Sequence, residues 1–293
     1  MKKAFVIAFT LLICFLNSSA QTVYNASKFS DAKKMHKKTV STLPIAISKH
    51  DVNKLLISDC YLTMIVSDKF AEKSFGNEAA LKKYVIKEME NYVDKVEPGE
   101  DYYTLLCNFI FSRFEKLFEE NSIEVVKKEA LFTNTKYVES GLISNNNGSY
   151  SGVAKNVNGG VEFTKTSTKM GKIPPINFKL REPEIALTLA HAAHTLGAKA
   201  SLRIGLEVEI DDNGILTIQS FTTKIDTYIS GYKKAKDMVY NFKVTDNNLF
   251  NLIKPIQGTL NYNTASAQDV NKELIEIISS VIEMYSYSLS SEL

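Results

Sequence analysis

Tryptophan is absent from the sequence, and cysteine and histidine are rare, with three and four copies among 293 residues. No G-x-x-x-x-G-K-[ST] loop, G-x-G-x-x-G turn or G-x-S-x-G elbow occurs in the chain. Loops of the first two kinds hold phosphate groups, and the third exposes the serine of many hydrolases. The sequence therefore shows none of these signatures of nucleotide-binding proteins and serine hydrolases, and we expect no cofactor.

The charge of the chain is nearly balanced. It has 35 lysine and arginine residues against 33 aspartate and glutamate residues, without a block of basic residues. Affinity for nucleic acids comes largely from basic side chains that neutralise phosphates, so the chain is not expected to bind DNA or RNA. With 44% hydrophobic residues it has enough apolar material for a sizeable core.

The first 20 residues have the pattern of a secretory signal peptide. Two lysines precede an apolar run of about 13 residues, from Ala4 to Leu16, and small polar residues follow up to Ala20. That run is shorter than the roughly 20 residues that cross a bilayer, which argues against an N-terminal membrane anchor. Lipid attachment at Cys14 is disfavoured because Ile13, and not a small residue, precedes it.

We therefore expect residues 1–20 to be removed and residues 21–293 to be exported. No later stretch has enough consecutive apolar residues to span a membrane. Loss of Lys2 and Lys3 with the leader takes the formal charge from +2 to 0. The expected location is the periplasm, the cell exterior or the outer membrane.

Apolar residues spaced three and four positions apart predict amphipathic helices over residues 77–96 and 101–120. A short helix-like segment is expected at residues 48–54. The stripe from Val270 to Tyr285 predicts a C-terminal helix, which a capping box at Ser266 would begin.

Another helix is expected from Pro183 to Leu196. Proline suits the first turn of a helix, and Gly197 suits the left-handed position that ends one. It leads into a β-hairpin over residues 199–227, in which Asp211 to Gly214 form the turn. Strict alternation of apolar and polar residues predicts an outer face on this hairpin that includes Arg203, Glu207, Glu209 and Gln219; we favour a solvated face and keep an interaction surface as the alternative.

Further strands are predicted at residues 55–66, 123–126 and 238–244. Residues 141–160 are rich in asparagine, glycine and serine, and they predict a flexible insertion or a hairpin with an open tip. Together the elements predict an α+β fold (mixed α/β), with two to three helices packed on a mostly antiparallel sheet, plus a C-terminal helix. Residues 21–293 would form one domain, and its sheet would have four to six strands.

His191 and His194 lie three positions apart, on one face of the helix that precedes the hairpin. Two histidines and a carboxylate from elsewhere could hold a metal ion. Alanines stand between these histidines, whereas the zinc helix of many hydrolases places a glutamate base there. We favour a helix face that packs on the sheet and keep a metal site at these histidines as the alternative.

Cys60 and Cys107 are the two cysteines that remain after cleavage. Both lie in apolar stretches, so buried thiols and a disulfide fit the sequence equally well.

The segment "LAHAAHTLGAKASLRIGLEVEI" resembles a unit found in bacterial envelope proteins, in which a helix ends in Leu-Gly-Ala and a hairpin follows. Similar units occur in the curli-secretion lipoprotein, in lipoprotein activators of penicillin-binding proteins and in the N-terminal domain of TolB. The resemblance covers residues 182–228, and residues 77–126 more loosely. It implies a partner-binding role in the envelope and assigns no functional residue, since those relatives are binding or assembly modules.

We expect an exported envelope protein, and we favour a non-enzymatic binding protein over an enzyme. Its partner would be another envelope protein. Two other functions stay open: a secreted metal-dependent hydrolase that uses His191 and His194, and a periplasmic carrier of an apolar ligand.

Overall fold

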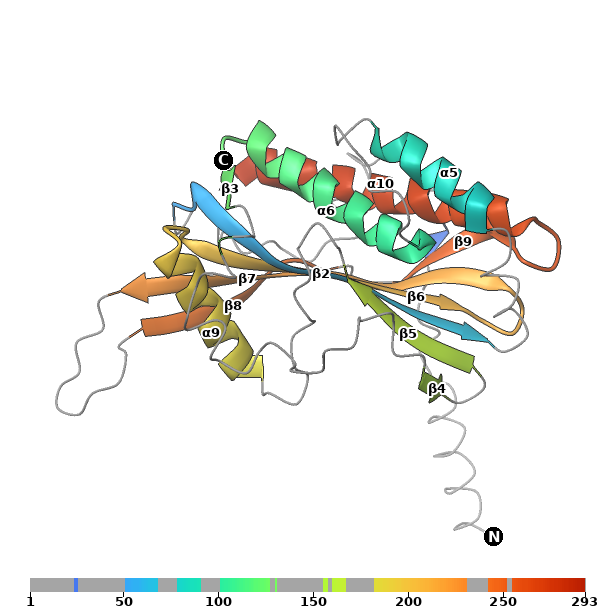
Figure 1. Cartoon of the computed structure of the whole chain (residues 1–293), viewed down its shortest axis with the longest axis horizontal. Helices are drawn as coiled ribbons and strands as arrows, with labels where there is room; N and C mark the ends of the chain where they lie inside the picture. Colours follow the sequence, from blue (N-terminus) through green and yellow to red (C-terminus); the bar gives the residue numbers. More distant parts are fainter. Residues whose placement is uncertain are drawn as a thin grey trace, which may run out of the picture.

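The computed structural model describes residues 24–25, 51–67, 78–90, 101–126, 130, 155–157, 160–166, 182–230, 242–251 and 255–292. For some of these, including Asp59 and residues 182–188, it describes the backbone alone. The described part confirms the predicted α+β fold, with helices packed on one mixed sheet (Figure 1). The predicted signal peptide lies outside the described residues.

Three long strands form the centre of the sheet: β2 (Lys54–Ser67), β6 (Ala200–Ile210) and β7 (Ile215–Ser230). The full order is β1-β9-β7-β6-β2-β5-β4, with β8 also paired to β7 and β3 to β2. The outer strands are β1 (Tyr24–Asn25), β3 (Glu124–Val125), β4 (Lys155–Val157), β5 (Gly160–Thr166), β8 (Phe242–Asn251) and β9 (Ile256–Asn261).

Most pairings in this sheet are antiparallel, as predicted, but β2 runs parallel to β6 and to β3, and β1 runs parallel to β9. The predicted hairpin is confirmed as β6 and β7, and it lies at the centre of the sheet. Its turn is held by Asp211, whose Oδ1 accepts hydrogen bonds from the backbone N–H groups of Asn213 and Ile215. Gly214 adopts φ +75° in this turn, a conformation that suits glycine.

One face of the sheet is covered by α5 (Glu78–Met89), α6 (Tyr102–Glu120) and α10 (Ala267–Glu292) (Figure 1). The predicted helices at 101–120 and at the C-terminal end are confirmed, and α5 confirms the described part of the helix predicted at 77–96. Asp101 begins α6 by accepting hydrogen bonds from the N–H groups of Tyr103 and Thr104, and the Ser266 hydroxyl accepts one from Asp269 at the start of α10.

Aromatic and aliphatic side chains fill the space between these three helices and the sheet. Phe114 of α6 lies at its centre, 5.1 Å from the Tyr285 ring in an edge-on contact and 6.0 Å from the Phe221 ring. Burial of Tyr285 raises its pKa above the ordinary value, and its hydroxyl group shares a 3.0 Å hydrogen bond with Thr223 of β7. Burial of Tyr102 likewise raises its pKa, so both phenols are neutral in the folded chain.

A buried carboxylate joins α10 to the strand β9. Glu273 accepts hydrogen bonds from the backbone N–H groups of Thr259 at 2.6 Å and Leu260 at 3.1 Å, and another from the Thr259 hydroxyl group. Gly258 leaves room for this carboxylate, because a Cβ atom there would lie 2.6 Å from the Glu273 Oε2 atom. The ladder between β7 and β9 is irregular at this point, so Glu273 accepts hydrogen bonds from N–H groups where the ladder is interrupted.

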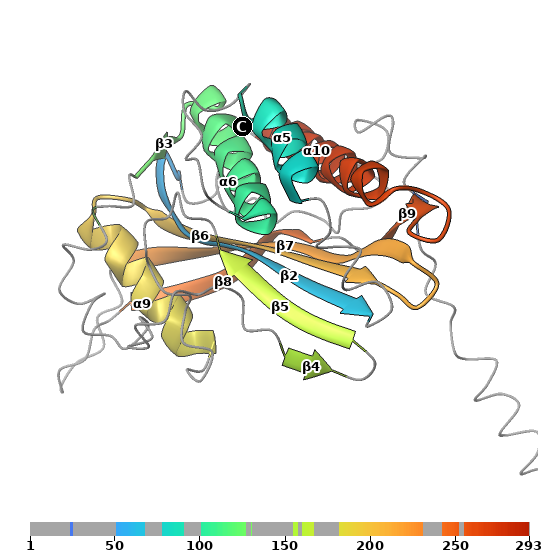
Figure 2. The same ribbon diagram turned by 45° about the vertical axis from the view of Figure 1, so that its right-hand side comes forward.

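Helix α9 (Glu182–Thr195) lies on the opposite face of the sheet from the other three helices (Figure 2). Its predicted end is confirmed: Gly197 has φ +76°, and the N–H groups of Gly197 and Ala198 donate to the carbonyls of His194 and Ala193. This is the Schellman arrangement, which satisfies the last carbonyls of a helix.

Several expectations need correction. Asp51 to Asn53 form a turn and irregular backbone, and Lys54 already belongs to β2, so the helix-like reading of residues 48–54 is wrong in its described part. Of the strand predicted at 238–244, residues 242–244 belong to β8, which extends to Asn251, and residues 238–241 lie outside the described part. The strands β5 and β9 were not predicted.

The insertion at 141–160 is described only at its end. There β4 and β5 pair antiparallel, with Val157 opposite Gly160, and the two alternatives for the insertion as a whole stay predictions. Residues 141–154 lie outside the described part.

Candidate functional site

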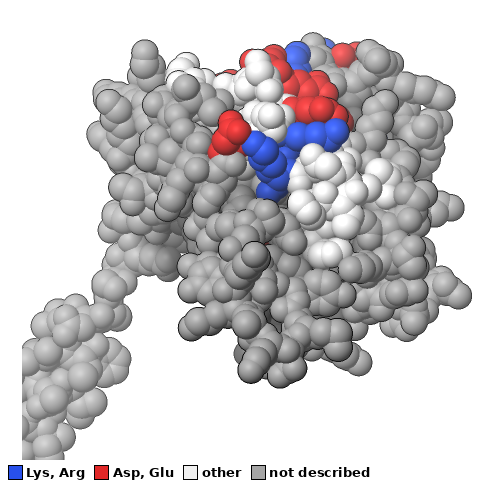
Figure 3. Space-filling view, turned by 90° about the vertical axis from the view of Figure 1, so that its left-hand side faces the viewer, with Lys and Arg blue, Asp and Glu red and all other residues white. Residues whose placement is uncertain are grey.

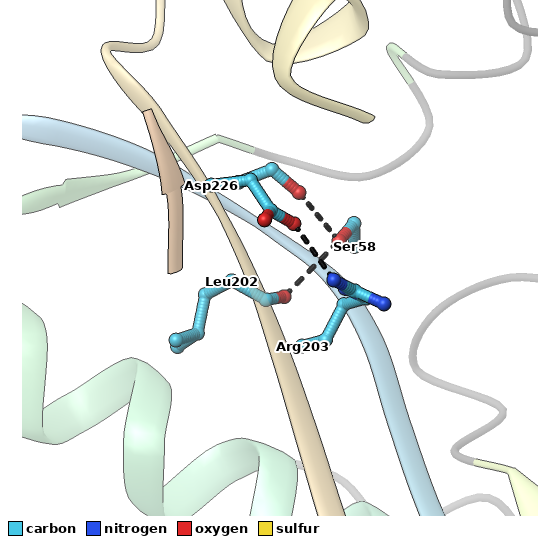
Figure 4. A network of polar contacts seen from close by, with 5 residues as sticks. Ser58, Leu202, Arg203 and Asp226 are labelled. Atoms are coloured by element: carbon cyan, nitrogen blue, oxygen red, sulfur yellow. Dashed lines mark hydrogen bonds and ion pairs between the residues drawn. The ribbon is translucent and has the colours of Figure 1, made fainter. Parts of the chain in front are cut away.

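Four polar side chains are buried on the face of the sheet that carries α9. They come from neighbouring strands: Ser58 from β2, Ser201 and Arg203 from β6, and Asp226 from β7. Figure 4 shows Arg203 and Asp226 directed toward one another, on the side of the strand opposite to Leu202, whose side chain joins the main core. We call these four residues the polar cluster.

Arg203 and Asp226 form an ion pair with an Nη2–Oδ2 distance of 3.1 Å. Arg203 is 8% exposed and Asp226 is fully buried. The prediction that Arg203 belongs to a solvated face is therefore wrong. Removing two charges from water costs several kcal/mol for each ion, and only their mutual attraction and further hydrogen bonds offset it.

The two serines of the polar cluster form a second contact. Their hydroxyl oxygens lie 2.6 Å apart, and the Ser58 hydroxyl also donates to the carbonyl of Leu202 at 3.1 Å. Ser58 occupies an irregularity of β2, because the register with β6 shifts between Ile57 and Asp59. The extra residue of such a bulge re-aims its neighbours, which brings the Ser58 hydroxyl to the next strand.

Beyond the polar cluster, the same face of β6 and β7 becomes exposed. Glu207 and Gln219 are exposed, and Ile65 of β2 is 37% exposed. The carboxylates are held in place: Glu207 accepts a 2.8 Å hydrogen bond from Ser220, and Glu209 accepts one from Gln219. We call Ile65, Glu207, Glu209, Gln219 and Ser220 the exposed strip. The predicted solvated face is confirmed for Glu207 and Gln219, whereas Glu209 is half-buried.

Tyr61 separates the polar cluster from the exposed strip. It lies opposite Gly205 in the ladder between β2 and β6. A Cβ atom on Gly205 would lie 2.5 Å from the Cζ and hydroxyl oxygen atoms of Tyr61, so the tip of this side chain lies against the bare backbone of β6.

The two histidines lie near the end of α9, where His191 is half-buried and His194 is exposed. Within the described ranges, no group of three or more histidine, cysteine, aspartate or glutamate side chains is placed to hold a metal ion. The side chains of Glu184 and Asp59, which could complete a site, lie outside what the structure describes. A metal site at His191 and His194 therefore stays a prediction.

Cys60 and Cys107 are both buried thiols, and the Cys60 Sγ atom lies 3.7 Å from the carbonyl oxygen of Cys107. The alternative of a disulfide between them is wrong. Their positions on β2 and α6 make them part of the main core.

A groove of about 310 Å³ runs between α6 and α10. Side chains of both charges line it, among them Arg113, Lys116 and Glu120 of α6 and Glu283 of α10. Carriers of apolar ligands enclose a mostly apolar cavity. This open, charged groove does not have that character.

Charges of both signs also lie side by side where β2, β3 and β6 begin (Figure 3). Lys54 pairs with Glu124 and Lys199 with Asp51, each at 2.7 Å. The hydrogen bond from Lys199 lowers the pKa of Asp51 below its ordinary value. On this surface, acidic and basic side chains therefore neutralise one another in pairs.

None of the helices in the described part of the chain is long and apolar enough to cross a membrane. Comparisons with known protein families, with curated proteins and with solved structures find no significant match to the chain.

Proposed function

We propose that the protein is an exported, non-enzymatic protein of the bacterial envelope that acts by binding another protein. The leader-like residues 1–20 support export. The resemblance of residues 182–228 to helix–hairpin units of envelope binding proteins supports a role in partner binding.

The observation that carries the binding proposal is the exposed strip. Its side chains stand on paired strands, so the backbone holds them rigidly and little conformational freedom is lost on contact with a partner. It combines carboxylates, an amide and the exposed Ile65, and interfaces of soluble proteins mix polar and apolar surface in this way. The other face of the same strands is buried under α5, α6 and α10.

Site-specific photo-crosslinking in the native cells tests this proposal. A photo-reactive residue at Gln219, in the exposed strip, should give one dominant adduct with an envelope protein. The same residue at Glu276, exposed on α10, is the matched control and should not give that adduct. Equal adducts at both positions, or none at Gln219, would contradict binding through the exposed strip.

Export needs its own test. Fractionation of the cells should place the protein in the envelope, and N-terminal sequencing of the mature form should begin at Gln21. If the protein is found in the cytoplasm and keeps Met1, the proposed location is wrong. The crosslinking experiment tests partner binding independently of this result.

A further inference from the structure

Helix α9 is attached to the sheet apart from the main core. Its described buried side chains are small, three alanines and one leucine: Leu189, Ala190, Ala192 and Ala193. None of them belongs to the core that α5, α6 and α10 form with the other face of the sheet. An alanine buries a single methyl group, whereas α6 contributes whole phenylalanine and leucine side chains.

The surface on the α9 side of the sheet is unusually polar for a buried face. It carries Leu56 but also the polar cluster, with the Arg203–Asp226 ion pair and the Ser58–Ser201 contact. Water stabilises such groups strongly when they become exposed. Lifting α9 would therefore return charged and hydroxyl groups to water, and of the buried side chains that the structure describes on α9 it would expose one leucine and three alanines.

The connection between α9 and β6 has the features of a hinge. Gly197 adopts φ +76° and is exposed, and two residues later the N–H group of Lys199 donates to the carbonyl of Lys54 at 2.9 Å. This bond ties the start of β6 to β2, so a change in backbone angle at Gly197 moves α9 without moving the sheet. Hinges commonly consist of a few such residues at the end of an element.

We propose that α9 is a hinged cover, which opens as a unit while the sheet and the other three helices stay folded. Opening uncovers the polar cluster on the same face as the exposed strip, so that the accessible surface extends from Asp226 past Tyr61 to Gln219. The open form would offer the larger surface to a protein partner, a step that rests on the proposed function.

Native-state hydrogen exchange followed by mass spectrometry tests the opening in the full chain, without any partner. Amides of residues 189–195 should be at least about 100-fold less protected than those of residues 274–285. The exchange rates of residues 189–195 should change little at low urea concentrations, as expected of a local opening. Equal protection of the two segments, with the same urea dependence, would show that α9 leaves the sheet only on global unfolding and would overturn the proposal.

A pair of variants tests the cause. Arg203→Met/Asp226→Leu makes the covered surface apolar and should raise protection of α9 about tenfold without changing that of α10. The control Lys272→Met/Glu276→Leu makes the same exchange at an exposed ion pair on α10 and should leave α9 unchanged. Unchanged protection of α9 in the first variant would overturn the proposed role of the polar cluster. If that variant fails to fold, the wild-type comparison decides alone.

Discussion

Glu273 offers a sharp test of how α10 holds the sheet. The substitution Glu273→Gln keeps the size of the side chain but replaces one accepting oxygen by an NH₂ group, which would face a backbone donor of β9. The carboxylate is 8% exposed and accepts hydrogen bonds from two N–H groups and one hydroxyl group. Bonds to a charged acceptor contribute about 1.5–3 kcal/mol each, so we expect the free energy of unfolding to fall by about 2–4 kcal/mol.

Urea denaturation with linear extrapolation measures this loss. The slope of the free energy of unfolding against urea concentration should be the same in the variant and the wild type. Glu276→Gln is the matched control, three positions along the same helix but exposed, and it should change stability by less than about 0.5 kcal/mol. A Glu273→Gln variant as stable as this control would refute the idea that the carboxylate anchors β9.

Gly258 gives a second measurement of the same contact. Gly258→Ala should destabilise the wild type, because the added Cβ atom would lie 2.6 Å from the Glu273 Oε2 atom. In a Glu273→Ala background that atom is gone, so the added cost should be smaller by roughly 1 kcal/mol or more. Additive effects would indicate that Gly258 and Glu273 do not share a site.

Other predictions follow from the buried polar groups and the histidines. Arg203→Met alone leaves Asp226 buried without its cation and should cost about 3–5 kcal/mol, whereas Arg203→Met/Asp226→Leu should unfold within about 1 kcal/mol of the wild type; single losses that simply add up would contradict this. Because the pKa of Tyr285 is raised in the folded state, its contribution to stability is complete below pH 10.0, the ordinary pKa, and declines as the pH rises above it. Tyr285→Phe should therefore make the alkaline loss of stability shallower by about 1.4 kcal/mol per pH unit, in denaturation curves at several pH values, and an unchanged slope would contradict this. Treatment with chelator and then Zn²⁺ should leave Tm unchanged, and a rise of several degrees that His191→Ala abolishes would instead establish a metal site.

Much of the fold follows from periodicity in the sequence. The stripes of α6 and α10 are long and strongly apolar, and the β6–β7 hairpin has an alternating strand and a clear turn, so local pattern was sufficient. The strands β5 and β9 were missed because each is short and pairs with a long strand that is distant in the chain, β5 with β2 and β9 with β7. Pairing of that kind is set by tertiary contacts and not by local propensity.

The polar cluster was missed for a different reason: along β7 the side chains that face the core change from even-numbered to odd-numbered residues. In β7 the buried positions are Leu216 and Ile218, then Phe221 and Ile225, so the inward side changes from even to odd numbers. The register with β6 shifts at the same place, between Glu207 and Val208. Such a bulge moves every later side chain to the other face of the sheet.

Without that shift Asp226 would lie on the main core side, away from Arg203. The sequence "ILTIQSFTTKI" shows this change, because beyond its first residue the large apolar residues shift from even-numbered to odd-numbered positions after Ile218. This shift was the signal in the sequence that could have placed Asp226 on the same face as Arg203. β2 shows the same change, between Ile57 and Cys60. For Arg203 alternation gave the correct face of β6, and the error was to treat that face as solvated, because α9 lies on it.

The parallel pairing of β2 with β6 has a consequence for the order of events during synthesis. Ser58 and Ser201, which touch across these strands, are 143 positions apart in the chain. A ribosome releases β2 and α6 long before β6 exists, so the early half cannot close its sheet alone. Chains dominated by such distant pairings fold slowly. If the protein is exported as proposed, slow folding would leave the chain unfolded for longer and so able to pass through a membrane channel.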